Sequence, residues 1–128
     1  MRSEAPVTRF LNVDLDIRGN AGDVEDFLRS LETSVVVLSH AGKEASIELA
    51  KDYPSLEDTV LRVIEFVGAL QPEHKSVLEG LEFRRLNVGI QAACNPHAAL
   101  FAISAKAIEM MAALRFEIVF TVYAPVKT

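Results

Sequence analysis

The chain has 128 residues, of which 50% are hydrophobic and 24% are charged, and its formal net charge at pH 7 is -5. This length and apolar content indicate one folded domain over residues 1–128 and exclude a disordered chain. The negative charge and the scattered basic residues argue against nucleic-acid binding, which depends on Lys and Arg replacing counterions.

The first predicted element is a strand over residues 8–18, in which apolar and polar residues alternate. The core side of this strand is expected to carry Arg9, Leu11, Val13, Leu15 and Ile17. The solvated side is expected to carry Phe10, Asn12, Asp14, Asp16 and Arg18. After a glycine-containing loop, Asp23 is predicted to cap a short helix.

The middle of the chain predicts a hairpin followed by two helices. Residues 34–38 and 45–50 are rich in strand formers, and Gly42 in the intervening loop supplies the backbone angles of a turn. Ser55 is expected to cap a helix that runs to Leu70, and a shorter helix over residues 73–79 ends at Gly80.

The last third predicts a strand over residues 82–93, a long helix over residues 95–114 and a final strand over residues 116–123. Asn95 is the expected cap of the long helix, and Pro96 suits its first turn. The apolar residues of this helix cover a wide arc, which is typical of a helix that faces two partners. Ser104, Lys106 and Glu109 interrupt the arc, so we expect no membrane span.

The predicted order of elements is β-α-β-β-α-β-α-β. It favours an α+β two-layer sandwich related to ferredoxin-like folds, with a mainly antiparallel sheet that helices cover on one face.

Three segments carry a family resemblance. They are "VDLDIRGNAGDVEDFLRSL", "LEGLEFRRLNVGIQ" and "AKAIEMMAALRFEIVFTVYA". In these hydrophobic patterns the chain resembles a mostly bacterial family of small domains of unknown function (domain of unknown function 4279). The resemblance implies no activity, cofactor or site residue.

Cys94 and His97 are the candidate catalytic pair, because they flank the predicted start of the long helix, where the helix dipole favours a thiolate. No third residue that would orient a base is evident, and a lone cysteine is usually a buried small hydrophobe. We therefore expect no catalytic centre. No His or Cys spacing typical of a metal site is present, so we expect neither a metal nor a cofactor.

The candidate binding residues form an acidic group and an apolar group. Asp14, Asp16, Glu48 and Glu117 would attract a basic protein, whereas Ile103 and Met110 would extend an apolar contact. We therefore expect a cytoplasmic, non-catalytic protein-binding domain. It would either associate with a second copy as a homodimer or act as an acidic inhibitor or immunity-type protein against a basic toxin or nuclease.

Two other functions are compatible with the sequence. The first is an enzyme or redox-sensitive protein that uses Cys94 and His97. The second is a sensor that holds a small molecule between the sheet and the helices, for which the sequence offers no polar anchor.

Overall fold

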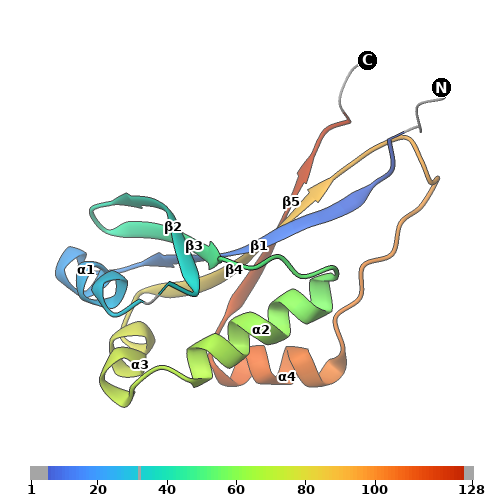
Figure 1. Cartoon of the computed structure of the whole chain (residues 1–128). Coiled ribbons are helices and arrows are strands. Elements are labelled where there is room, and N and C mark those ends of the chain that lie inside the picture. The colour runs from blue at the N-terminus through green and yellow to red at the C-terminus, as the bar shows by residue number, and fades with distance from the viewer. Residues whose placement is uncertain (1–5, 32, 126–128) are drawn as a thin grey trace.

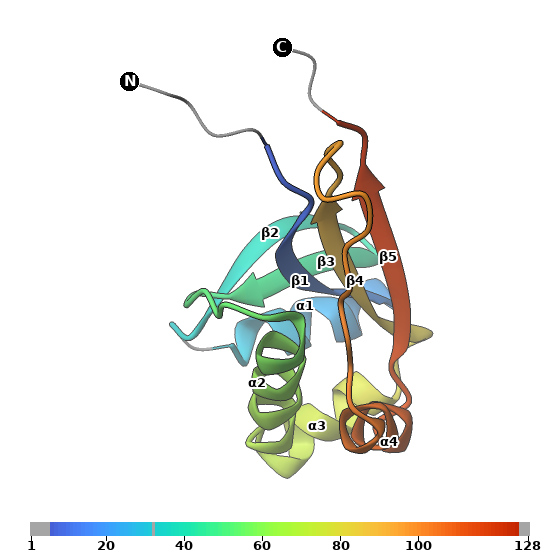
Figure 2. The same cartoon turned by 90° about the vertical axis from the view of Figure 1, so that its right-hand side faces the viewer.

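The computed structural model describes residues 6–31 and 33–125. Its single sheet has the order β2-β3-β1-β4-β5, and the helices lie on one side of it (Figures 1 and 2). The strands are β1 (Arg9–Arg18), β2 (Val35–Ala41), β3 (Glu44–Leu49), β4 (Phe83–Gln91) and β5 (Glu117–Tyr123). The helices are α1 (Ala21–Arg29), α2 (Leu56–Gly68), α3 (Pro72–Glu79) and α4 (Ala105–Ala113).

The predicted α+β fold with a mainly antiparallel sheet is confirmed. Strands β1 to β4 pair antiparallel in the order of a ferredoxin-like domain, and β5 is added at one edge, parallel to β4. In the described part of the chain, no helix has the length and apolar character needed to span a membrane.

The core lies between the sheet and the helices, because the strands turn one side chain in two toward the helical layer. Its most buried members include Leu15, Ile17, Val24, Phe27, Ile47, Val60, Val67, Leu78, Leu86 and Val88. The other face of the sheet is left open to solvent (Figure 2). The predicted solvated face of β1 is therefore a face of the whole sheet.

The start of β1 departs from the predicted alternation. Phe10 pairs with Ile90 but Asn12 pairs with Gly89, so the register shifts and Leu11 occupies a bulge. A bulge inserts one residue and reverses the sides of the residues that precede it. Phe10 consequently packs against the core, and Leu11 is 38% exposed.

The prediction of a long helix over residues 95–114 is wrong, because α4 begins only at Ala105. The carbonyl of Asn95 accepts the N–H of Thr8, 2.7 Å away, and Asn95 forms an isolated parallel bridge with Val7. This pairing with the N-terminal segment holds Asn95 outside a helix. Leu100, expected in the apolar arc, is 96% exposed.

The predicted cap of α1 and the predicted length of the hairpin loop also need correction. The cap of α1 is Asn20, whose Oδ1 accepts from the N–H groups of Gly22 and Asp23 at 2.9 and 3.4 Å. The predicted loop of the β2–β3 hairpin is too long, because the strands continue to Ala41 and resume at Glu44. Gly42 has a positive φ of 57°, as the turn prediction required.

The hydroxyl of Ser104 caps α4 and accepts from the N–H of Ala107 at 3.1 Å. Replacing Ser104 with alanine should therefore lower the free energy of unfolding by about 1 kcal/mol. Urea denaturation followed by circular dichroism measures the change. The matched control is Asn95→Ala, and an equal loss in both variants would contradict the assignment of the cap.

Candidate functional site

The candidate site lies on the open face, where β3, β1 and β4 run side by side. Because Val13, Leu15 and Ile17 face the core, the alternate residues Asp14 and Asp16 face outward. The register places Asp16 between Ser46 of β3 and Arg85 of β4, and it pairs Asp14 with Asn87 of β4. Polar side chains from three strands are thereby brought into neighbouring rows.

One side-chain amide joins two of the carboxylates. The Nδ2 of Asn12 donates to Oδ1 of Asp14 at 2.9 Å and to Oε2 of Glu48 at 3.2 Å. Glu48 extends to this point from β3. It therefore lies close to Asp14, with which the sequence analysis grouped it. Asn12 orients both carboxylates with one side chain.

Asp16 is held by a second set of hydrogen bonds. Its Oδ1 accepts from the hydroxyl of Ser46 at 2.7 Å, and its Oδ2 accepts from Nδ2 of Asn87 at 3.5 Å. The Oδ1 of Asn87 in turn accepts from the hydroxyl of Thr121 at 2.8 Å. These contacts run from β3 across β1 and β4 to β5 and fix the position of the Asp16 carboxylate.

The grouping of carboxylates changes the chemistry of Asp14. Partial burial, followed by the negative charges of Glu48 and Asp16 and a hydrogen bond with Glu48, raises the pKa of Asp14 from 3.8 to about 6. A carboxyl group with this pKa can exchange a proton near neutral pH. Its ionised form is therefore less favourable than that of a free aspartate, and a nearby positive charge would stabilise it.

Beside these residues the open face is hollowed, with a volume of about 390 Å³. The lining is mostly polar and comes from β1, β2, β3 and β4: Asp14, Asp16, Ile17, Ser39, Glu44, Ala45, Ser46, Phe83, Arg85 and Asn87. A side chain from a partner can therefore enter beside the carboxylates.

Two arginines on this face, Arg18 and Arg85, already have carboxylate partners. Arg85 pairs with Glu117 at 3.3 Å, and its guanidinium lies 4.2 Å from the ring centroid of Phe83. Arg18 pairs with Glu44 and Glu82 at 3.0 and 3.1 Å. Within the described residues, no Lys or Arg forms an ion pair with Asp14, Asp16 or Glu48.

Glu117 therefore lies apart from the other predicted acidic residues. It shares the open face with them, but Arg85 stands between it and Asp16 in the register. The charge of Glu117 is compensated by Arg85, so the uncompensated acidic group consists of Asp14, Asp16 and Glu48.

The two predicted apolar contacts occupy different environments. Ile103 is partly buried and packs against the core, so it contributes little surface. Met110 is 37% exposed on α4.

Cys94 and His97 do not flank a helix. Both are exposed and lie before α4, in the non-helical residues 92–104. The dipole of a helix terminus, on which the thiol hypothesis depended, is therefore missing at Cys94.

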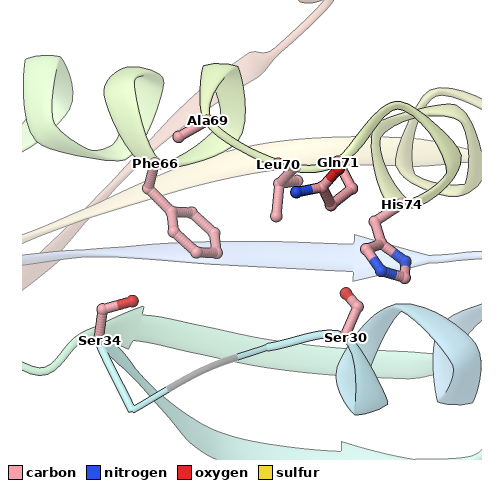
Figure 3. Close-up of a pocket in the computed structure, with 7 residues that line it drawn as sticks. All are labelled: Ser30, Ser34, Phe66, Ala69, Leu70, Gln71 and His74. Carbon is pink, nitrogen blue, oxygen red and sulfur yellow. The ribbon is translucent and has the colours of Figure 1, made fainter.

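A second hollow, of about 240 Å³, lies between the connection from α1 to β2 and the junction of α2 with α3 (Figure 3). Figure 3 shows the ring of Phe66 directed into it, with Ser30 and Ser34 on one side and Gln71 and His74 on the other. The hydroxyl of Ser30 donates to the carbonyl of Phe27 at 2.6 Å. This hollow has room for a small molecule, but its lining among the described residues includes no sheet residue and carries no uncompensated charge comparable with that of the open face.

No cluster of three His, Cys, Asp or Glu residues suited to a metal ion occurs in residues 6–31 and 33–125. Comparison with family models, with curated proteins and with solved structures finds no match to this chain. The function is accordingly inferred from the open face.

The sequence interpretation missed Ser46, Asn87 and Arg85 as members of the site. Their alternation within β3 and β4 places them on the polar side of each strand, and that was a usable signal. Their proximity to Asp16 depends on strand order and register, which alternation does not specify.

Proposed function

We propose that this domain acts without catalysis and binds a basic protein through the acidic group Asp14, Asp16 and Glu48 on the open face of its sheet. The observation that carries the proposal is the contrast in charge pairing. Arg18 and Arg85 on this face have carboxylate partners, whereas these three carboxylates have no ion pair among the described residues.

The raised pKa of Asp14 supports the same proposal. Partial burial and repulsion by Glu48 and Asp16 make the ionised form of Asp14 less favourable in the free domain than in an isolated aspartate. A Lys or Arg side chain placed in the hollow would offset that repulsion. Part of the free energy lost by keeping the carboxylates together would then be recovered on binding.

The rigidity of the carboxylates favours a specific contact. Asn12, Ser46 and Asn87 hold them by hydrogen bonds, so little side-chain entropy would be lost when a partner binds. A partner with a basic nucleic-acid-binding surface, such as a toxin or nuclease, has matching charge, and opposite charges speed association. An inhibitor or immunity-type role is the form of this function that we favour.

The test uses a synthetic peptide of alternating lysine and arginine, titrated into the labelled domain while amide chemical shifts are recorded. We expect the largest changes at Asp14, Asp16 and Glu48, and we expect them to weaken as salt rises. The variant Asp14→Asn/Asp16→Asn/Glu48→Gln should bind at least about tenfold more weakly.

The matched control is Asp26→Asn/Glu73→Gln/Glu109→Gln, which removes the same charge from exposed helix positions. This control should bind nearly as well as the parent domain. Equal weakening in the two triple variants, or shifts confined to the helices, would show that the peptide senses net charge alone and would reject the proposal.

Binding to the same peptide should also depend on pH. If a bound cation returns the pKa of Asp14 from about 6 toward 3.8, affinity at pH 7 should exceed that at pH 5 by about tenfold. Isothermal titration calorimetry at the two pH values measures the ratio. A ratio near one, with Asp14 present and the peptide bound, would contradict this coupling.

A further inference from the structure

The strand β5 is an outer edge of the sheet (Figure 2), and its side chains there are largely apolar. Phe120, Val122 and Tyr123 are 50%, 59% and 52% exposed. Glu117 is the only charged residue in β5, and the strand contains no proline. Proteins usually protect such an edge with charges, proline or a bulge, because its unpaired backbone groups can pair with another strand.

The two edges of the sheet differ in this protection. At the opposite edge, β2 pairs with β3 through an irregular register between Val37 and Ser39, where the ladder is interrupted. The register of β5 against β4 is continuous from Glu117 to Tyr123. The two edges therefore differ in their ladders, and β5 is the edge whose ladder is uninterrupted.

The backbone groups of β5 alternate between its two sides. The carbonyl of Tyr123 accepts the N–H of Ala92, so Tyr123 directs its backbone groups toward β4. Successive residues of a strand point these groups in opposite directions, so Ile118, Phe120 and Val122 direct theirs away from the sheet. These three residues supply the free donors and acceptors of the edge.

We propose that β5 pairs antiparallel with β5 of a second copy of this chain, about a two-fold axis at Phe120. In this register Phe120 faces its own counterpart, and Ile118 faces Val122 of the other copy. Both pairs present outward backbone groups, as the hydrogen-bonded positions of an antiparallel ladder require.

The side chains favour a second copy as the occupant. On the helix-facing side the register joins apolar residues only, and on the open side it joins Val119 with Thr121. Glu117 faces Tyr123, so the two Glu117 carboxylates lie at opposite ends of the contact instead of opposing each other. On α4, which leads into β5, Ile108 and Met110 are exposed at 53% and 37% and can extend the apolar contact.

The paired copies would form one continuous sheet, with both open faces on the same side and the acidic groups displayed together. This association uses a strand edge that the acidic group does not reach, so it does not depend on the proposed function. The variants below leave Asp14, Asp16 and Glu48 unchanged, and peptide binding can be measured on each of them.

Sedimentation equilibrium tests the proposal at chain concentrations on the order of 10 to 100 μM. We expect the parent protein to approach twice its chain mass of 14.1 kDa. Phe120→Glu, which would oppose two carboxylates at the axis, should reduce the mass to that of one chain. Val37→Glu is the matched control on the other edge, because Val37 is 44% exposed, and it should remain a dimer.

A single-chain mass for the parent protein throughout this range, or dissociation by Val37→Glu alone, would overturn the proposal.

A disulfide test examines the register and does not rely on the glutamate variant. Residues opposite each other at a hydrogen-bonded antiparallel position have Cα atoms about 5.5 Å apart, which a disulfide can span.

Under mild oxidation, Phe120→Cys in a Cys94→Ser background should form a covalent dimer. Val122→Cys in the same background should not, because its two copies would lie about 13 Å apart along the strands. Cross-linking of Val122→Cys in place of Phe120→Cys would exclude the proposed axis.

Discussion

Replacing Arg84 with methionine should lower the free energy of unfolding by about 3 kcal/mol. Arg84 is 7% exposed on the helix-facing side of β4. Its Nη1 donates to the carbonyls of Leu78 and Glu79 at 2.9 and 3.0 Å, and its Nε donates to the carbonyl of Leu114 at 3.3 Å. Methionine fills a similar volume but offers no donor. These carbonyls would then lose a charged partner in a buried place.

Arg84 connects the ends of two helices to the sheet. Leu78 and Glu79 close α3 and Leu114 follows α4, where the last carbonyls of each helix lack N–H groups from a further turn. Burial lowers the pKa of Arg84, but an arginine remains charged and can serve several acceptors through its planar fork.

Urea denaturation at pH 7 measures the effect. Arg84→Lys keeps the charge but has one donor nitrogen, so it should lose about half as much stability as Arg84→Met. The control is Arg85→Met on the open face, where a partly exposed ion pair with Glu117 contributes less than about 1 kcal/mol. Equal losses for the methionine variants at the two positions would contradict the assigned role of Arg84.

Replacing Asp14 with asparagine should raise the free energy of unfolding at pH 7 by about 1 to 2 kcal/mol. The pKa of Asp14 is raised to about 6 by burial, by Glu48 and by Asp16, so its ionised form opposes folding. The full shift corresponds to about 3 kcal/mol, and the lower figure allows for solvent screening of a half-buried group. An asparagine can still accept from Asn12 and can donate to Glu48.

The stability gained by Asp14→Asn should depend on pH, and the direction follows from the raised pKa of Asp14 in the native state. Because the native state raises the pKa of Asp14, the stability associated with its proton is fully present below pH 3.8 and is lost as pH rises through about 6. The advantage of Asp14→Asn should therefore be small near pH 4, grow between pH 4 and 6 and remain constant above that.

Urea denaturation of both proteins across this pH range tests the curve. Asp52→Asn, at an exposed position, is the control and should follow the parent protein within about 0.5 kcal/mol at each pH. A loss of stability in Asp14→Asn at pH 7 would mean that the ionised Asp14 carboxylate contributes favourable interactions, and it would remove one support of the proposed function.

The acidic group was predictable in part. Alternation over residues 8–18 placed Asp14 and Asp16 together on a solvated face, because the side chains of a strand alternate wherever its register is regular. Glu48 was named from another strand, and its contact with Asn12 depends on β3 lying beside β1. Ser46, Asn87 and Arg85 became neighbours of Asp16 only through strand order and register.

The failed helix prediction has a related cause. Asn95 and Pro96 are good residues for a helix start, but their local preference amounts to about 1 kcal/mol. The pairing of residues 7 and 8 with Asn95 joins segments far apart in the sequence. Ser104 was available as a cap nine residues later, and the structure uses it.

The amino-acid sequence by itself determined the α+β class, the helix that follows Ser55 and the polar character of one side of β1, because each follows from the spacing of neighbouring residues. Tertiary structure alone decided which strands lie next to one another, where α4 begins and which carboxylates lack a cationic partner within residues 6–31 and 33–125. Those features depend on backbone pairing and charge contacts between distant segments, whose free energies exceed the local preferences that a sequence pattern reports.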